Sequence, residues 1–331
     1  MTRLRVLVAV AQHGSVTAAA RSLNYAQPSV SHHLARLEAE TGATLTQRSG
    51  RGIRLTDAGR LLAGRAEEIL GRLDAAEREL AAHVEQRQER IRLAVFASAL
   101  ATIVPAALSR LAAGHPGIDL LLAEAEPPEA MRMLRAGQVD VALVSRHTQN
   151  GTPVGAAAAA EGARTRLILD EQVHLVTRPR QRGTQPAAQP GAGAPAPGEA
   201  GAPDLAAHAH SPWIAGCEHC RGHLIWLCQH AGFSPKIAFT TDDHVAAQAL
   251  VAAGLGVTIL PGLAINAARH PGIRAQPLPG AWRQVLAVTY GQPPDPRAVD
   301  HLLDILTLAA AATATGSGAQ SPGGGAGAGV A

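Results

Sequence analysis

SVTAAARSLNYAQPSVSHHLARLEAETG, residues 15–42, has the residue order expected of two short helices joined by a tight turn. Ser15 is a side-chain cap for a first helix over 17–23, and Asn24 makes the turn with the tyrosine after it. Pro28 then lies in the first turn of a second helix, where its missing N–H costs nothing. The segment therefore predicts two helices that pack closely around the turn.

The second of these helices has two unlike faces. One stripe is aliphatic and consists of Val30, Leu34 and Leu37. At 100° per residue, the opposite side carries three polar residues, Ser29, His32 and Arg36. We therefore expect a helix that buries one face and presents polar groups on the other.

Positive charge is concentrated around this segment. The whole chain of 331 residues carries a formal net charge of only +3. Residues 1–60 hold eight arginines against Glu38, Glu40 and Asp57, a net charge of +5, so the remainder sums to −2. A local excess of this kind suits a polyanionic partner better than the total charge suggests.

An ordered set of motifs extends through this region and beyond it. It comprises AA at 18–19, L at 23, QPSVS at 27–31, LE at 37–38, G at 42, L at 45, R at 48 and RGIRLTDAG at 51–59. This set resembles the winged helix-turn-helix of LysR-type transcriptional regulators. One departure is Thr46, where the family usually has an aromatic residue, and we expect weaker packing beneath the wing there.

The resemblance implies that the helix after Pro28 lies in the DNA major groove. It also implies that RSGRGIR, 48–54, forms a β-wing against phosphate or the minor groove. Gln and Arg make bidentate contacts with base edges, and Ser bonds bases or phosphate. The DNA-binding residues implied are Gln27, Pro28, Ser29, Ser31, His32, Arg36, Arg48, Arg51 and Arg54. Taken alone, these arginines could simply make the helical surface soluble. The surrounding motif favours a role in DNA binding instead.

A long helix without proline is predicted from the Thr56 cap to about residue 88. Apolar residues recur in it at alternating steps of four and three: Leu62, Ala66, Ile69, Leu73, Ala76 and Leu80. Such a heptad stripe needs a partner helix, either from a second chain or from elsewhere in the same chain. We expect a homodimer, as in the family, and hence a roughly palindromic target with two half-sites.

From IRLAVF at 91–96 the chain alternates strands and helices, with helices over 103–113 and 128–137 and strands over 118–123 and 139–144. This order predicts an α/β fold with a parallel sheet. LRAGQVDVALV and LVAAGLGVTILP resemble the two-lobed, periplasmic-binding-protein-like effector domain of the same family. The expected fold class is thus α/β, with an all-α-type winged helix-turn-helix domain and a long linker helix before it.

Domain limits follow from these patterns. They are 1–56 for the winged domain, 57–89 for the linker and dimerisation helix, 90–313 for the effector domain and 314–331 for a disordered tail. Lobe one takes about 90–163 and 275–313, and lobe two about 164–274. The Pro-, Gly- and Ala-rich stretch 183–203 is predicted to be a disordered insertion, because it cannot bury enough apolar surface to repay its ordering entropy.

A small molecule would bind where strands end and helices begin, since free N–H groups there favour an anionic effector. Ser98 is predicted to cap a helix with its hydroxyl in the crevice, although a plain cap without ligand contact is the alternative. By similarity to the family, the loops between the lobes would line the cleft. The effector-binding candidates are Ser98, Thr102, Ser145, Gly216, Cys217 and Thr240.

Three cysteines and a histidine cluster in one short stretch: Cys217, Cys220, His223 and Cys228. Their spacing fits a zinc knuckle poorly, because that motif needs four residues between its second cysteine and the histidine. A dithiol sensor is a second interpretation, since thiols at a helix N-terminus have a lowered pKa. The third interpretation, which we favour, is that these cysteines are inert and serve only structure or line a pocket. We predict no resident metal.

We expect a DNA-binding transcriptional regulator rather than an enzyme, with no cofactor. No G-x-G-x-x-G follows a strand, and neither a G-x-S-x-G elbow nor a convincing carboxylate pair is present. The rival class is an enzymatic or solute-binding α/β protein. An enzyme would need motifs of this kind, which the chain lacks, and a solute-binding protein would need a signal peptide. We expect a cytoplasmic protein without membrane contact, whose partners are duplex DNA, a small molecule and a second copy. Tetramers and RNA polymerase are further partners of the family.

Overall fold

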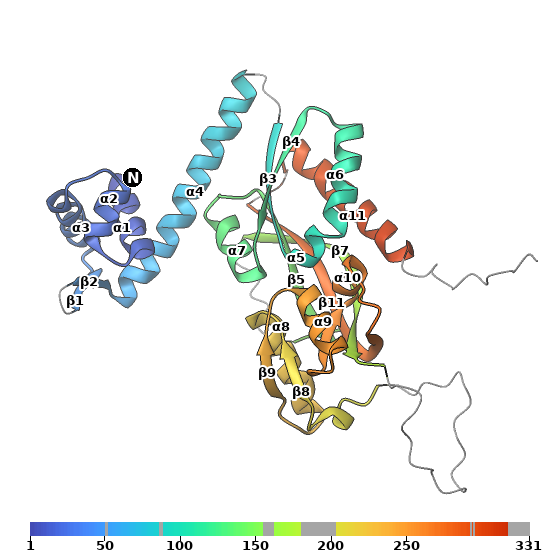
Figure 1. Ribbon diagram of the computed structural model, residues 1–331. Coiled ribbons are helices and arrows are strands. Elements are labelled where there is room, and N and C mark those ends of the chain that lie inside the picture. Colours follow the sequence, from blue (N-terminus) through green and yellow to red (C-terminus); the bar gives the residue numbers. More distant parts are fainter. Residues whose placement is uncertain are drawn as a thin grey trace, which may run out of the picture.

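The protein is a linear arrangement of a winged domain, a long helix and a two-lobed α/β domain (Figure 1). A computed structural model describes residues 1–49, 52–85, 89–154, 162–179, 203–291, 293 and 295–316. The winged domain consists of α1 (Thr2–His13), α2 (Val16–Ser22), α3 (Gln27–Thr41), β1 (Thr46–Ser49) and β2 (Gly52–Leu55). The hairpin β1–β2 is antiparallel.

Local capping starts and stops these helices where the sequence predicts. The Ser15 hydroxyl accepts a hydrogen bond from the Ala18 amide at 3.1 Å, which confirms the predicted cap of α2. Pro28 occupies the first turn of α3, also as predicted. Gly14 ends α1 in the left-handed conformation, with φ of 66°, which favours glycine. The three helices then pack around one aliphatic core.

The linker helix α4 (Asp57–Glu85) begins at the predicted cap, because the Thr56 hydroxyl accepts from the Gly59 amide at 3.0 Å. Its last predicted residues, 86–88, lie outside the described part of the chain. Ala63 joins the core of the winged domain, so α4 and that domain share apolar packing. Further along, Gly71 lies directly against the turn that follows α7 of the effector domain.

The effector domain holds the remaining elements. Its strands are β3 (Glu89–Val95), β4 (Ile118–Glu124), β5 (Val141–Gln149), β6 (Thr152–Pro153), β7 (Ala163–Thr177), β8 (Pro212–Ala215), β9 (Lys236–Thr240), β10 (Thr258–Pro261) and β11 (Arg274–Tyr290). Its helices are α5 (Ala97–Leu100), α6 (Ile103–Gly114), α7 (Pro127–Arg135), α8 (Glu218–His230), α9 (His244–Ala252), α10 (Gly262–Ala267) and α11 (Arg297–Gly316). A short 3-10 helix, η1 (Ala206–His208), precedes β8.

The main sheet is mixed rather than parallel. Its order is β10-β7-β11-β5-β3-β4, with β6 beside β5. The predicted parallel arrangement holds for β3 with β4 and with β5, whereas β11, β7 and β10 join antiparallel. The sheet is mixed because β11, which comes late in the chain, is not joined to its neighbours by the crossover helix that a parallel strand requires. A second, two-stranded sheet pairs β8 with β9 in parallel.

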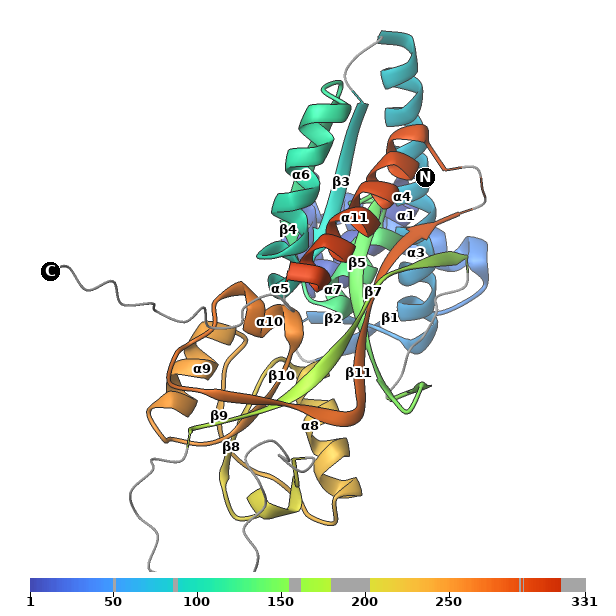
Figure 2. The ribbon, with the colours of Figure 1, turned by 90° about the vertical axis from the view of Figure 1, so that its right-hand side faces the viewer.

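Two long strands connect the lobes. β7 and β11 pair over most of their length and curve from the upper lobe into the lower one (Figure 2). Arg274 lies opposite Thr177 at one end of the pair and Tyr290 lies opposite Ala163 at the other, so the two predicted lobe limits fall at opposite ends of it. Those limits themselves stay a prediction.

Alternating side chains of the lobe-one strands fill two cores, one on each sheet face. Leu93 and Leu143 point to the face covered by α6 and α11, while Ala94 and Ala142 point to the face covered by α7. Lobe two has two cores of its own. One lies between β8 and α8, and the other involves β10, α9 and α10. Both cores that cover the lobe-one sheet are dominated by aliphatic side chains.

Several predictions fall at the edge of the described residues. The predicted disordered insertion lies outside them except for Pro203. Helix α11 continues through Gly316, past the predicted start of the tail at residue 314, and the rest of that tail lies outside. Among the residues that are described, no helix combines the length and apolar character needed to cross a bilayer.

Candidate nucleic-acid interface and effector cleft

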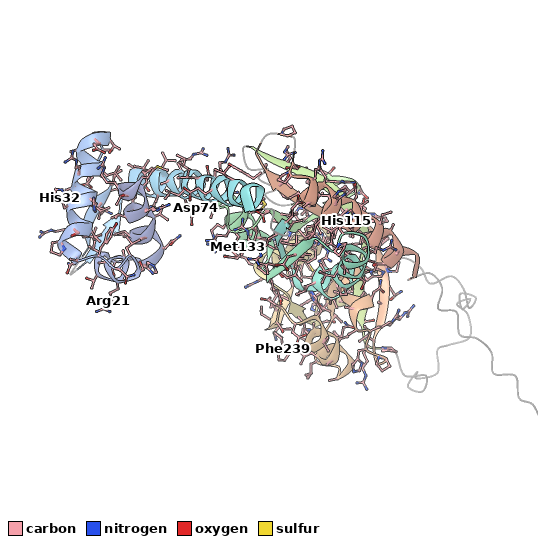
Figure 3. All side chains as sticks on the ribbon, turned by 90° about the horizontal axis from the view of Figure 1, so that it is seen from above. Arg21, His32, Asp74, His115, Met133 and Phe239 are labelled. Carbon is pink, nitrogen blue, oxygen red and sulfur yellow. The ribbon has the colours of Figure 1, made fainter. Side chains whose placement is uncertain are left out.

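Helix α3 presents the predicted polar face. Val30, Leu34 and Leu37 are buried, as the periodicity predicts. The predicted DNA-facing side chains of this helix are all exposed: Gln27, Pro28, Ser29, Ser31, His32 and Arg36. Figure 3 places His32 on the side of the winged domain that faces away from the effector lobes. Nothing in the same chain covers this face among the described residues.

Glu38 fixes the wing to α3. One oxygen of its carboxylate accepts from the backbone amides of Leu45 and Thr46 at 2.8 and 2.9 Å and from the Thr46 hydroxyl at 3.0 Å. The Thr46 hydroxyl therefore adds one polar contact to the two that backbone amides make. This bonding sets the position of β1 relative to α3.

Two of the three arginines predicted on the wing lie within the described residues. Arg48 and Arg54 are exposed, on β1 and β2. Arg51 lies outside the described residues. Arg36 lies 3.6 Å from Glu40 one turn along α3, an exposed ion pair that is weak in water and leaves the guanidinium free to rearrange.

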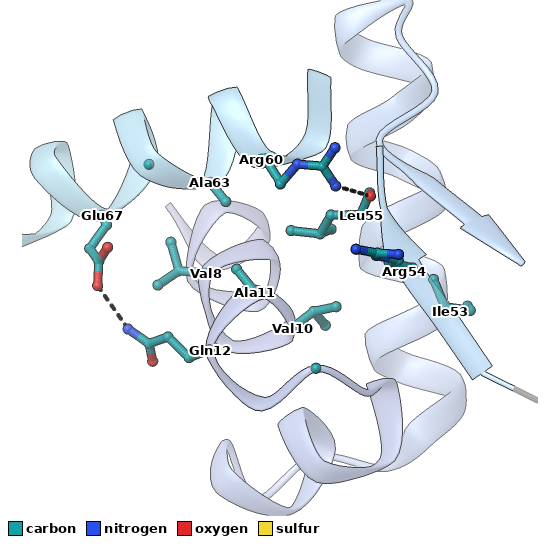
Figure 4. A pocket seen from close by; sticks show the side chains of 12 residues that line it. Val8, Val10, Ala11, Gln12, Ile53, Arg54, Leu55, Arg60, Ala63 and Glu67 are labelled. Carbon is teal, nitrogen blue, oxygen red and sulfur yellow. Dashed lines mark hydrogen bonds between the residues drawn. The ribbon is translucent and has the colours of Figure 1, made fainter. Parts of the chain in front are cut away.

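A pocket of about 360 Å³ lies between α1, the wing and α4 (Figure 4). Aliphatic side chains form much of its wall, among them Val8 and Leu55. Gln12 donates to Glu67 at 2.9 Å across one side of it, and Arg60 donates to the Leu55 carbonyl at 2.8 Å. The pocket marks the junction of the wing with the linker helix and is remote from the predicted effector residues.

A buried ion pair lies where the lobes meet. Arg283 of β11 donates from Nε to Glu171 of β7 at 2.6 Å, and their exposed fractions are 2% and 8%. Glu171 also accepts from the Leu263 amide at 2.6 Å, and the Arg283 guanidinium lies 4.9 Å from the Phe96 ring centre. The two charges are thus satisfied by several partners, as buried charges must be.

Ser98 differs from its prediction. Phe96, not Ser98, is the N-cap residue of α5, and Ser98 lies inside that short helix with 1% exposure. Its hydroxyl accepts from Arg283 Nη2 at 2.9 Å instead of capping the helix or lying open to a crevice. A buried arginine from 185 residues further along the chain takes up this hydroxyl.

The other predicted effector residues occupy different environments. Thr102 donates its hydroxyl to the Ser98 carbonyl at 2.6 Å, and it is the N-cap of α6 without a side-chain cap bond. Ser145 is buried inside β5, which runs five residues past the predicted end of the strand. Gly216 precedes α8, and Thr240 is exposed at the end of β9.

Side chains of the two lobes contact one another directly. Cys217, the N-cap of α8 in lobe two, donates its thiol to Glu126, the N-cap of α7 in lobe one, at 3.4 Å. His147 of β5 stacks on His223 and on His219 of α8, with ring centres 4.0 and 5.0 Å apart.

The histidines of this interlobe contact are held neutral. Burial lowers the pKa of His147, His219 and His223, and it brings that of His223 to about 4. Both ring nitrogens of His147 and of His223 are buried without a hydrogen-bond partner among the described residues. Burial also raises the pKa of Glu126.

The three cysteines fall into two environments. Cys217 and Cys220 are partly exposed at the start of α8, whereas Cys228 is fully buried in the lobe-two core. In the described part of the chain, no three His, Cys, Asp or Glu side chains are grouped so as to hold a metal ion. Hydrogen bonding with Cys217 lowers the pKa of Cys220, while the pKa of Cys217 is raised, chiefly by the same hydrogen bond.

Sequence reasoning missed the residues that join the two lobes. Arg283, Glu126 and His147 lie in a strand, at a helix start and in another strand, and none is part of a recognisable motif. Their only sequence signal is a charged or polar residue inside an otherwise apolar run, as in AWRQVLAV for Arg283. That signal cannot say which distant residue will neutralise it.

Comparison with known families covers nearly the whole chain. Residues 1–60 match the family described as "Bacterial regulatory helix-turn-helix protein, lysR family", and residues 85–311 match "LysR substrate binding domain".

Curated relatives are similar over most of their length. TfdS, a transcriptional regulator of Cupriavidus pinatubonensis, is 30% identical over 87% of this chain and 91% of its own. YcgK, an uncharacterised regulator of Bacillus subtilis, is 29% identical over 80% of each chain. A probable hydrogen peroxide-inducible genes activator of Mycobacterium avium is 29% identical over 82% of this chain and 85% of its own.

Solved structures share the fold. CbnR, in a complex with its target DNA, covers 93% of this chain and 99% of its own, with a TM-score of 0.56 and 22% identity. Full-length OxyR from Pseudomonas aeruginosa covers 93% of this chain and 94% of its own, with a TM-score of 0.58 and 23% identity. Given matches to both family domains, this chain belongs to the LysR family, whose members are DNA-binding transcriptional regulators with an effector-binding domain and not enzymes.

Proposed function

We propose that the chain binds promoter DNA as a homodimer, with α3 in the major groove and the wing beside it, and that a small molecule in the interlobe cleft changes this binding. The observation that carries the proposal is the exposed polar row on α3, held outward by three buried aliphatic residues. CbnR, which has the same fold, has been solved with its target DNA. The place of action would be the cytoplasm, where bacterial promoters lie.

The contacts with DNA are assigned by side-chain chemistry. Gln27, Ser29, Ser31, His32 and Arg36 face base edges or phosphate from α3, and Pro28 starts the helix there. Arg48, Arg51 and Arg54 approach the backbone or minor groove from the wing. Because arginines release counterions from phosphate, affinity falls steeply as salt rises.

Dimer formation is supported by the second half of the apolar stripe of α4, which the same chain leaves exposed. Ile69 is 52% and Leu80 is 65% exposed, although both belong to the heptad pattern. A second copy of α4 would bury this stripe and place two α3 helices on one side of the pair. The target is then roughly palindromic. Pairing of dimers into tetramers and a contact with RNA polymerase would build on this dimer.

The effector acts through its different affinity for two arrangements of the lobes. Cleft residues proposed to meet it are Ser98, Thr102, Ser145, Gly216, Cys217 and Thr240. Arg283 favours an anionic molecule, but only one that can compete with Glu171 for the guanidinium.

Band-shift titration with the duplex upstream of the chain's own gene tests the proposal. The native protein should bind, with affinity falling as salt is raised. Arg36→Ala should weaken binding by about 1–3 kcal/mol, the usual effect of removing one base-reading arginine. The matched control is Arg110→Ala, an exposed arginine on α6, which should bind as the native protein does. Equal affinity of all three proteins would contradict the assignment of α3.

A further inference from the structure

Three imidazoles from the two lobes form one stack where the lobes meet. His147 belongs to β5, and His219 and His223 lie one turn apart on α8. The ring centre of His147 is 4.0 Å from that of His223 and 5.0 Å from that of His219. The ring planes are inclined by 17° and 27°, so the rings lie face to face. Because each ring can take up a proton, this contact between the lobes contains three titratable groups.

The rings of the stack have few polar partners. Both nitrogens of His147, both of His223 and Nε2 of His219 are buried without a hydrogen-bond partner in the described part of the chain. His147 and His223 are each only 3% exposed. A charged group that is buried without an acceptor is costly. The packed stack is therefore stable only while its rings are neutral.

Positive charge is already present beside the stack. Arg283 of β11 is the cross-strand partner of His147, and like charges in directly opposite positions destabilise a sheet. Glu171 of β7 is engaged by this guanidinium at 2.6 Å. His219 lies in the first turn of α8, next to the exposed Glu218, where the helix dipole disfavours a cation. A proton on His147 or on His219 is thus opposed by charge as well as by burial.

The other titratable groups nearby belong to the start of α8 and to the elements around it. Glu126, the N-cap of α7, accepts from the Cys217 thiol at 3.4 Å. Asp242, which follows β9, acts on the charge of Glu126 and of Cys220. His244 begins α9, and burial lowers its pKa, as does Arg283. Among the described residues, none of these groups bonds to the buried ring nitrogens, so none holds a proton there.

Separation of the lobes would change the proton affinity of the rings. Burial lowers the pKa of His147, His219 and His223, and brings that of His223 to about 4, whereas a free imidazole has a pKa near 6.5. Separated lobes therefore bind protons that joined lobes do not, in the pH range between these values. At about pH 5.5, each freed ring favours the separated form by roughly tenfold. The stabilisation by neutral rings is accordingly complete above pH 6.5 and is lost as the pH falls toward 4.

We propose that His147, His219 and His223 form a pH-sensitive latch, in which neutral rings hold the lobes together and protonation at mildly acidic pH separates them. Up to three protons bind to the ring nitrogens as the lobes separate, and they leave when the lobes rejoin. Gly137 of lobe one contacts Gly71 of α4, so the movement can be passed to the linker helix. Promoter binding then depends on pH, a consequence that rests on the proposed function.

NMR of the full-length protein with carbon-labelled histidine rings tests the latch. The signals of the three rings should titrate together at one midpoint, between about 4 and 6.5, with an uptake of about three protons per chain. Small-angle X-ray scattering should show a larger radius of gyration over the same pH range, while the helical circular-dichroism signal stays unchanged. Rings that titrate independently, a constant radius, or loss of the helical signal at the same midpoint would overturn the inference.

Single substitutions identify the rings that form the latch. His147→Phe keeps a ring in the stack that cannot be protonated, so it should take up about two protons and its lobes should separate at a lower pH. His219→Phe removes a less buried imidazole and should have the same effect where His147→Phe disturbs folding. The matched control is His230→Phe, an exposed imidazole further along α8, whose lobes should separate at the native pH. Separation of both stack variants at the native pH would show that these rings do not form the latch.

Band-shift titration with the same upstream duplex tests the consequence for DNA binding. Across the midpoint, the affinity of the native protein should change by about fivefold or more relative to that of His147→Phe, the lower end of usual allosteric couplings. Both proteins carry the same imidazoles on α3, so the comparison removes the effect of pH at the DNA-facing surface. An identical pH dependence of the two proteins overturns this consequence alone. Absence of binding by either protein at every pH contradicts the proposed function, while NMR and scattering still decide the latch.

Discussion

At the scale of single residues, the buried Arg283 guanidinium connects β11, β7 and α5. Its partners Glu171 and Ser98 are almost fully buried, so neither water nor salt screens the ion pair strongly. Glu171→Gln would leave the positive charge buried without its counter-charge. We expect a loss of about 3–5 kcal/mol in the free energy of unfolding, measured with urea.

The exposed pair of Arg90 with Asp119 is the control for this substitution. Its side chains are separated by 3.0 Å but are 65% and 41% exposed. Asp119→Asn should therefore cost only about 0–1 kcal/mol. If Glu171→Gln costs no more than the control, Arg283 is not a central element of the cleft.

The buried ring of His223 makes stability depend on pH. Burial lowers its pKa from 6.5 to about 4, so the folded protein binds fewer protons than the unfolded chain between these values. The contribution of the neutral ring is fully present above pH 6.5 and is lost as the pH falls toward 4. In urea midpoints measured across this range, His223→Leu should flatten the decline. The exposed His210→Leu is the control, and equal slopes for both variants would contradict the assignment.

At the scale of elements, a glycine contact couples the linker helix to lobe one. A Cβ on Gly71 of α4 would overlap the backbone carbonyl of Ala136, and Gly137 faces Gly71 from the other side. Arg72 reinforces this contact, since its guanidinium lies 4.4 Å from the centre of the Tyr290 ring. Movement of lobe one can reach α4 through this contact.

Substitution of Gly71 tests the contact against another glycine of the same helix. Gly64 has open space around its Cα, so Gly64→Ala should stabilise the helix by about 1 kcal/mol. Gly71→Ala should lower the thermal midpoint instead, because α4 must separate from the turn after α7. An increase in midpoint for both variants would show that the helix is not held against lobe one.

Local elements were predictable where a single period governs them. The buried face of α3 and the caps at Ser15 and Thr56 follow from residue order within one turn or two. β7 and β11 did not follow, because each crosses from lobe to lobe and carries two burial patterns in one strand. Pro277 and Gly280 also interrupt β11, at a shift in its register with β7.

The contacts between the lobes were less predictable than the DNA-facing surface, because they join residues that are far apart in the sequence. The row on α3 is contained in one helix, whereas Ser98 is bound by a residue 185 positions away and Cys217 by one 91 positions away. Helix periodicity locates Cys217 and Cys220 together, but only the fold brings Glu126 to them. Ser98 was accordingly predicted as a cap and found as a buried acceptor.

At the scale of the whole molecule, the α3 face, the α4 stripe and the interlobe cleft lie on separate parts of the chain. From Ile69 to Leu80 the stripe is exposed in the single chain, and its burial against a second copy would give two reading helices with two-fold symmetry. Changes in the cleft can then alter the spacing between those helices through α4. The central claim is that the pair reads one duplex.

Hydroxyl-radical footprinting of the native protein on the duplex upstream of its gene tests this claim most directly. We predict two protected major-groove segments whose centres are separated by about 10 base pairs or a multiple of that spacing, on one face of the duplex. Protection of a single segment, or none at low ionic strength, would contradict the account.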